Sequence, residues 1–168
     1  MKTEVENALG VLVGASLSAA YRAVNMEMFQ FGELEVVSGR YGSGKRGEYA
    51  LHIQCTWRIV GPQGIIVGSG DLYYPAGDPR VVDENFDWAE AESTQRDQRV
   101  AGLLAGWSGS QPVVESVESD DVGSIRIALT QGFIIEVFPD SSLETEMWRL
   151  LTRGSLDHFV VTGRGIED

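Results

Sequence analysis

Residues 39–45, GRYGSGK, have the spacing of a phosphate-binding loop. They match the pattern G-x-x-x-x-G-K, in which backbone amides and the lysine hold phosphate groups. The full motif continues with a hydroxyl residue that binds Mg²⁺ and with a helix whose N-terminus faces the phosphates. Here Arg46 follows instead, and residues 48–57 have the period of a strand. We therefore interpret residues 39–46 as a flexible Gly/Ser loop between two strands, and we expect no nucleotide site.

A zinc site, or a Cys-His or Ser-His-Asp nucleophile, would have to draw on His52, Cys55 and His158, the only histidines and the only cysteine of the chain. On a regular strand, residues an odd number of positions apart point to opposite faces, so His52 and Cys55 should diverge. Cys55 shares its face with Leu51 and Trp57, which indicates a buried small hydrophobe. A zinc site needs at least three protein ligands, so it would have to recruit both histidines and the lone cysteine from far apart in the chain, and we expect none. One cysteine also forms no intrachain disulfide, which favours a reducing compartment.

Carboxylates are frequent near two predicted turns, at Glu115, Glu118, Asp120, Asp121 and Asp140. Glycosidase chemistry requires two carboxyl groups at a fixed separation inside a cleft. Acidic residues at a turn are explained by turn conformation alone. We therefore expect no catalytic residue, no metal and no cofactor.

Aromatic residues within an acidic, irregular segment are the one feature that suggests recognition. The segment follows Tyr73-Tyr74-Pro75 and contains Trp88. An exposed aromatic residue can anchor a partner, although it can also simply cover the edge of the core. The candidate partner-binding residues are Tyr73, Tyr74, Asp83, Glu84, Asp87 and Trp88.

Length and charge limit the class of protein. A chain of 168 residues fits one domain, 1–168, that is large enough to fold without disulfides or metals. Its net charge of -12 repels phosphate backbones, so we expect no binding to nucleic acid, while a basic partner is permitted. The apolar stretch at residues 8–20 is interrupted by glycines and serines and is shorter than a membrane span. We expect a cytoplasmic protein that does not enter a membrane.

The pattern of apolar residues predicts an α+β fold, with a mostly antiparallel sheet of hairpins and a meander packed by one or two helices. The best helix runs from Thr94 to Gly106, with Ser93 or Thr94 as its cap. Val5, Leu9 and Leu12 have the spacing of one helical face, although the nearby glycines make this a poor helix. The expected extended segments are 25–37, a hairpin over 49–67, a three-stranded meander over 113–137 and a last strand at 158–162, with a short helical turn at 144–151.

Four segments, with the sequences LHIQCTWRI (51–59), GSGDLY (68–73), IIEVFPDSS (134–142) and HFVVTG (158–163), resemble a family of bacterial proteins of similar length. The sequence MWR at 147–149 belongs to the same set. The resemblance extends from about Leu9 to the end of the chain. That family has no established activity, so the resemblance implies a bacterial cytoplasmic domain and no functional residue.

Three hypotheses for function remain open. The first is a non-enzymatic acidic interaction protein, such as an immunity-type protein that neutralises a basic toxin. The second is an enzyme or small-molecule binder with a pocket between the sheet and the helix at 94–106. Its candidate polar groups are Arg58, Asp71, Asp140 and Arg149. The third is a homodimer that pairs through an exposed sheet edge.

Overall fold

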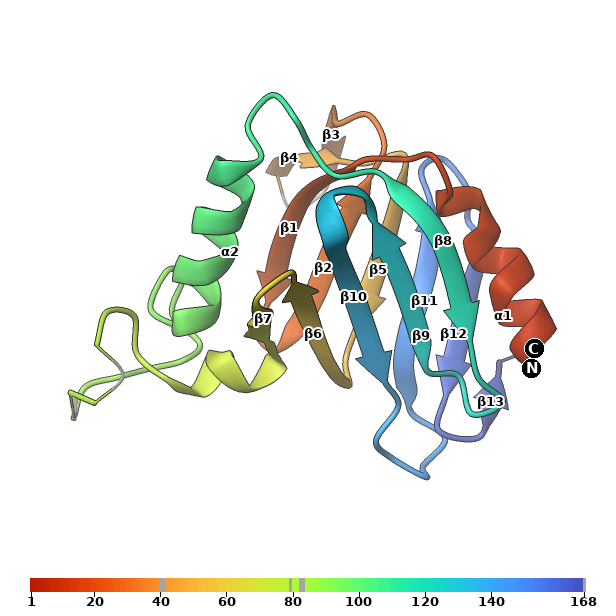
Figure 1. Cartoon of the computed structure of the whole chain (residues 1–168). Coiled ribbons are helices and arrows are strands. Elements are labelled where there is room, and N and C mark those ends of the chain that lie inside the picture. The colour runs from red at the N-terminus through yellow and green to blue at the C-terminus, as the bar shows by residue number, and fades with distance from the viewer. Residues whose placement is uncertain (40–41, 79, 82–83, 168) are drawn as a thin grey trace.

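The chain folds into two large antiparallel β-sheets and two α-helices, as the computed structural model in Figure 1 shows. The structure describes residues 1–39, 42–78, 80–81 and 84–167. Sheet dominates and strand pairs are antiparallel, so the predicted α+β class is confirmed. The helices are α1 (Lys2–Leu9) and α2 (Gln95–Gly106), with short 3₁₀ turns at Gly10–Leu12, Ser69–Tyr73 and Thr130–Gly132. The strands are β1 (Leu17–Ala23), β2 (Met26–Phe31), β3 (Glu35–Gly39), β4 (Gly42–Arg46), β5 (Tyr49–Ile53), β6 (Thr56–Gly61), β7 (Gly64–Gly68), β8 (Val114–Ser119), β9 (Ile125–Leu129), β10 (Phe133–Phe138), β11 (Glu146–Thr152), β12 (His158–Thr162) and β13 (Gly165–Ile166).

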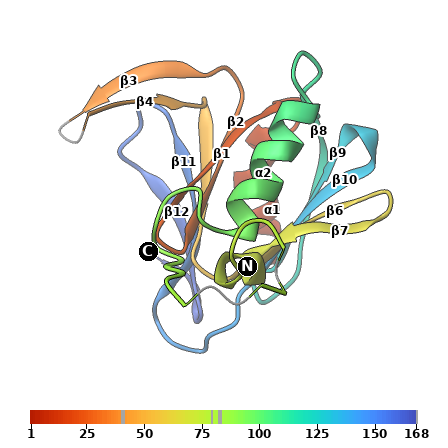
Figure 2. The same ribbon diagram turned by 90° about the vertical axis from the view of Figure 1, so that its left-hand side faces the viewer.

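The two large sheets lie on either side of one apolar core (Figure 2). One sheet has the strand order β1-β2-β5-β11-β12-β13, and the other has the order β7-β6-β10-β9-β8. Phe29 of the first sheet and Trp57 of the second meet edge to face, with ring centroids 5.3 Å apart. Trp148 is fully buried, and its Nε1 donates to Gly123 O at 2.8 Å, which satisfies the one polar atom of this side chain.

A sharp corner carries the chain from one sheet to the other. The alternating pattern over 49–57 predicts one strand, but the chain leaves β5 after Ile53 and enters β6 at Thr56. Asp140 fixes this corner, because its Oδ2 accepts from Thr56 N at 3.1 Å and from Thr56 Oγ1 at 2.6 Å. Cys55, at the corner, is buried as predicted. The period of two persists across the break because both strands face the same core. The predicted hairpin therefore reduces to β6 and β7, while β5 pairs with β2 and β11.

The two helices cover opposite sides of the core (Figure 1). Helix α1 packs on β8 and, with the turn that follows it, buries Val5, Leu9 and Leu12, which is the predicted face. Helix α2 is also as predicted: Thr94 is its N-cap, and Val100 is buried beneath it. Figure 2 shows α2 in front of the core, between β1 and β7.

Two sequence predictions are wrong. Residues 144–151 are no helical turn, since Glu146–Thr152 is the strand β11 in the middle of a sheet. A bulge there turns both Met147 and Trp148 inward, which hides the alternation of a strand. A similar bulge lies in β1 (Leu17–Ala23), a strand that was not predicted, and two consecutive residues, Ala19 and Ala20, are buried there. Residues 42–46 are no connecting loop either, because Gly42–Arg46 pairs with Glu35–Gly39 as a two-stranded arm. The intervening Arg40 and Tyr41 lie outside the described residues.

Candidate functional site

The acidic segment of residues 73–92, here called the acidic loop, leaves and re-enters the fold at the N-terminus of α2. Its two ends are joined by a backbone bond from Ala76 N to Ser93 O and another from Gln95 N to Tyr74 O, both 2.8 Å. The buried side chain of Gln95 strengthens the closure, because its Nε2 donates to Pro75 O at 2.9 Å and to Gly77 O at 2.6 Å. The loop is thus presented from a rigid base.

Two of the predicted aromatic residues come together on this loop. The rings of Tyr73 and Trp88 meet edge to face, with centroids 5.7 Å apart. Tyr73 is 56% exposed and Tyr74 is 53% exposed, while Trp88 is half-buried. An exposed aromatic pair on a fixed base has the rigidity and the apolar area of a binding anchor.

The carboxylates of the acidic loop are exposed and mostly unpaired. Asp78 is the exception: hydrogen bonds from Arg80, one of them 2.7 Å long, hold the pKa of this carboxyl below its ordinary value. Within the described part of the chain, no lysine or arginine lies within 4.0 Å of the carboxylates of Glu84, Asp87, Glu90 or Glu92. The predicted Asp83 lies outside the described residues. By contrast, every described lysine and arginine except Lys45 and Arg46 lies within 4.0 Å of a described carboxylate.

Beneath the loop, four charged side chains connect α2 to the six-stranded sheet: Glu27 and Arg96 are buried, and Arg22 and Asp97 are partly buried. Arg96 on α2 holds the carboxylate of Glu27 on β2 with both Nε and Nη2, and its Nη1 lies 3.3 Å from Asp97 Oδ1. Arg22 on β1 holds Asp97 with Nε at 2.7 Å and Nη2 at 2.8 Å. The same Nη2 donates to the backbone oxygen of Glu90 in the acidic loop at 2.5 Å. We call Arg22, Glu27, Arg96 and Asp97 the buried ion network.

The sequence contained a sign of this network that the pattern analysis missed. Glu27 shares its strand face with Phe29 and Phe31, which are both fully buried, so its parity alone places a carboxylate in the core. Burial raises the pKa of Glu27 to about 7, against the opposing effect of Arg96. Burial would also raise the pKa of Asp97, but hydrogen bonds from Arg22 and Thr94 hold it below its ordinary value.

The space between α2 and the sheet, where the second hypothesis expects a ligand pocket, contains a cavity of about 10 Å³ beside the buried ion network. This volume admits about one water molecule. The candidate polar groups of that hypothesis do not line the cavity and are engaged at separate places. Arg58 pairs with Glu136 at 2.6 Å, Asp71 accepts from Gly68 N at 2.9 Å, Asp140 holds the corner, and Arg149 lies 3.1 Å from Glu146.

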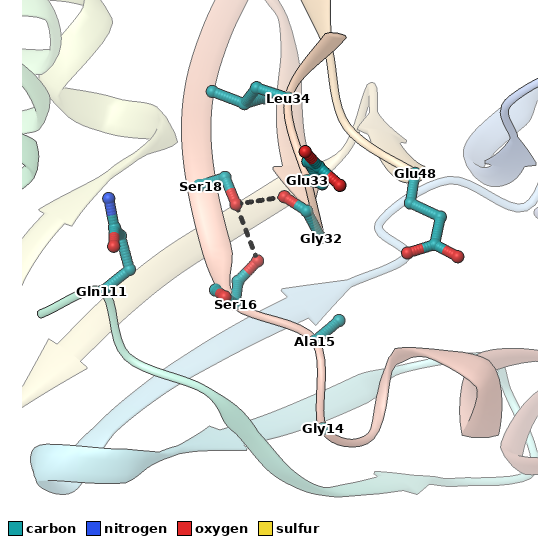
Figure 3. A pocket seen from close by; sticks show the side chains of 9 residues that line it. All are labelled: Gly14, Ala15, Ser16, Ser18, Gly32, Glu33, Leu34, Glu48 and Gln111. Carbon is teal, nitrogen blue, oxygen red and sulfur yellow. Dashed lines mark hydrogen bonds between the residues drawn. The ribbon is translucent and has the colours of Figure 1, made fainter.

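A larger open hollow of about 490 Å³ lies elsewhere, beside the start of β1 and the end of β2 (Figure 3). Its lining is mostly small residues, and the polar side chains are those of Ser16, Ser18, Glu33, Glu48 and Gln111. Ser18 Oγ lies 2.5 Å from Gly32 O and 3.2 Å from Ser16 O, so this hydroxyl is used within the wall. Gly32 has φ +78°, and a Cβ there would come within 2.8 Å of Glu48 Cβ, so glycine is required to shape the rim.

His52 and Cys55 are poorly suited to acid–base or nucleophilic chemistry. His52 pairs across the strands with Arg149. His52 Nδ1 and Arg149 Nε are both buried and have no hydrogen bond among the described residues, because the 3.1 Å ion pair between Arg149 Nε and Glu146 does not have hydrogen-bond geometry. Burial, and then the positive charges of Arg149 and Arg46, lower the pKa of His52 to about 4. Burial raises the pKa of Cys55 to about 12, so this thiol is a poor nucleophile. No three His, Cys, Asp or Glu side chains in the described ranges are arranged to hold a metal ion.

The carboxylates near the β8–β9 turn serve the backbone, as the sequence predicted for turn residues. Asp120 Oδ1 accepts from Val122 N at 3.0 Å and from Ser124 N at 2.8 Å. Burial alone would raise the pKa of Asp120, but these hydrogen bonds hold it below its ordinary value. These bonds explain Asp120 as a residue that stabilises the turn.

No family model, no curated protein and no solved structure matches this chain significantly. The resemblance to a bacterial family therefore stays a prediction. Across the described residues, no helix combines the length and the apolar composition needed to cross a membrane.

Proposed function

We propose that this protein is a non-enzymatic interaction protein that binds a basic protein partner through the acidic loop, as an immunity-type protein does. The observation that carries this proposal is the combination in one loop of a fixed base, an aromatic pair of exposed Tyr73 and half-buried Trp88, and exposed carboxylates without an ion pair. The aromatic pair Tyr73 and Trp88 supplies apolar contact area. Glu84, Asp87, Glu90 and Glu92 supply the charge.

Electrostatics gives such a loop a clear kinetic role. The chain has a net charge of -12, and nearly all its described cations are already neutralised by neighbouring carboxylates. The unpaired negative charge of the loop is therefore free to attract a basic surface. Complementary charge accelerates association, and salt weakens it because the Debye length falls to about 10 Å at 0.1 M.

The test has two steps, capture followed by a defined measurement of affinity. The immobilised protein is exposed to an extract of its source cell at low ionic strength, and retained proteins are eluted with salt and identified. A purified retained protein is then titrated at several salt concentrations. We expect a basic partner whose Kd rises with salt.

Two charge-matched double variants make the test specific to the loop. Glu84→Gln with Asp87→Asn removes two loop carboxylates, while Glu115→Gln with Glu118→Gln removes two exposed carboxylates on β8. The loop variant should weaken binding by about tenfold or more, which corresponds to about 1.4 kcal/mol, and the β8 variant should not. Capture of no protein, or equal binding by both variants, would refute the proposal.

A second candidate, small-molecule binding, is supported by the open hollow in Figure 3. Its volume of about 490 Å³ lies within the range of ligand pockets. A thermal-shift screen against metabolites tests it, because a ligand that binds only the native state raises Tm. The stabilisation should disappear in Gln111→Ala, which changes an exposed residue of the lining. A screen without any stabilising compound would count against this candidate.

A further inference from the structure

Arg22 is the residue that connects the acidic loop to the buried charges. Its guanidinium reaches three partners beyond β1: the carboxylate of Asp97 on α2, the backbone oxygen of Glu90 in the loop, and the backbone oxygen of Val24 at 3.0 Å, directly after the strand. Asp97 in turn is shared with Arg96, which holds Glu27. A continuous chain of charged contacts thus runs from the core strand β2 to the loop.

We propose that the buried ion network is a proton-operated latch of the acidic loop: its contacts hold the loop in place while Glu27 is ionised and release it when Glu27 is protonated. A proton on Glu27 cancels its charge and weakens its hold on Arg96. Arg96 then turns to Asp97 and competes with Arg22 for this carboxylate. Arg22 loses its fixed position, and with it the loop loses the bond at Glu90. This inference concerns the regulation of the loop, so its biological role rests on the proposed function, whereas the latch itself does not.

The balance of charges supports this sequence of events. The network contains two arginines and two carboxylates, so it is neutral when Glu27 is ionised. Protonation leaves one uncompensated positive charge in a buried site, which is costly unless a partner is found. The nearest remaining carboxylate is that of Asp97, already 3.3 Å from Arg96 Nη1. Asp97 therefore is the group through which the excess charge is relieved.

Glu27 is placed so that protonation is accessible near neutral pH. Its side chain is 2% exposed, and burial raises its pKa to about 7. The charged groups that act on it are Arg96 and Asp97 from α2 and Arg22 from β1. The remaining residues that line the adjacent cavity carry no charge: Val24, Asn25, Trp57, Ser69 and Leu72.

The same contacts reach the base of the loop through the helix cap. Thr94 Oγ1 accepts from Asp97 N at 3.1 Å, and Thr94 N donates to Asp97 Oδ2 at 3.4 Å. Thr94 also forms a backbone bridge with Pro75, where the loop begins. A displaced Asp97 side chain therefore disturbs both the cap of α2 and the closure of the loop.

The test is amide hydrogen–deuterium exchange of the free protein, followed by mass spectrometry of the peptide that covers residues 73–92. Rates are measured from pH 8 to pH 6 and corrected for the intrinsic pH dependence of exchange. The corrected rate in the loop should rise about ninefold with a midpoint near pH 7, as the protonated fraction of Glu27 rises from about one tenth to about nine tenths. Peptides from β5 and β11 report the core and should not change.

Two variants locate the effect. Glu27→Gln cannot be charged, so its loop should exchange at the fast rate at both pH values. Glu136→Gln removes a glutamate that is also paired with an arginine, at 2.6 Å, but in the other sheet, and it should retain the response of the original protein.

The proposal is overturned if the loop of the unmodified protein exchanges at the same corrected rate at pH 8 and pH 6, a result that needs no variant to fold. It is also overturned if Glu27→Gln retains the pH response. Since exchange is measured without a partner, salt-sensitive binding combined with pH-independent exchange would remove the latch and leave the proposed function intact.

Discussion

Replacing His52 by glutamine should change the pH dependence of folding stability in a calculable direction. His52 is neutral in the folded protein because burial and the neighbouring Arg149 lower its pKa to about 4. In the unfolded chain the imidazole has its ordinary pKa of about 6.5. Between these two values only the unfolded chain takes up the proton, so the stability contributed by neutral His52 is present above pH 6.5 and is lost as the pH falls towards 4.

The size of this effect follows from the two pKa values. The difference between 6.5 and about 4 corresponds to about 3 kcal/mol, and screening by solvent at this partly buried side chain reduces the expectation to about 2 kcal/mol. Urea unfolding gives the free energy of unfolding at pH 7.5 and at pH 4.5. Between these two pH values, this free energy should fall by about 2 kcal/mol less in His52→Gln than in the original protein. His158→Gln removes an exposed imidazole and serves as the control. Equal losses in His52→Gln and the original protein would refute the reasoning.

Three further predictions concern other single positions. Glu27→Gln should have the opposite effect on pH dependence, because between about pH 7 and 4.5 the folded protein takes up a proton on Glu27 and the unfolded chain does not. On acidification the free energy of unfolding of the original protein should therefore rise by up to about 3 kcal/mol in the same urea experiment, and that of the variant should not. Thr94→Ala should cost about 1 kcal/mol in urea unfolding through loss of the cap on Asp97 N, and Thr94→Ser should restore most of it; equal stability of both variants would contradict the cap. Gly32→Ala should lower stability by about 1–3 kcal/mol in thermal unfolding, because the φ of +78° and the close approach of Glu48 both oppose a Cβ at this position. Gly10→Ala is the control, since a Cβ at Gly10 would meet no neighbouring atom and should cause no steric destabilisation.

The parts of the fold that could be predicted are those in which one local pattern decides the structure. Helix α2 has a capping threonine and apolar residues at helical spacing, and the meander β8-β9-β10 has short turns between alternating strands. Where a strand contains a bulge, as at Met147 and Trp148, two consecutive inward side chains erase the alternation. The corner after Ile53 leaves no trace at all, because the two sheets share a core and the alternation continues through it.

The candidate site shows the same division. The aromatic and acidic composition of the loop is visible in the sequence, and so are Tyr73, Tyr74, Glu84, Asp87 and Trp88 as its members. The partners of the buried ion network are not visible, since Glu27 and Arg96 are 69 positions apart and only the assembled sheet and helix bring them together. Long-range pairing of this kind is decided by tertiary packing rather than by local propensity.

The position of β11 has a consequence for how the chain folds. Strand β11 lies between β5 and β12, so the centre of the six-stranded sheet is completed by a segment that follows β5 by about ninety residues. Contacts between residues so far apart in the sequence form only after a long loop has closed, and closing this loop costs conformational entropy before the contact stabilises the chain. Such contacts therefore slow folding. During synthesis, the edge of β5 that pairs with β11 therefore stays open until the C-terminal strands emerge. We expect chains that end before β11 to aggregate through the open edge of β5, and we expect the meander β8-β9-β10, whose contacts are local, to form earlier.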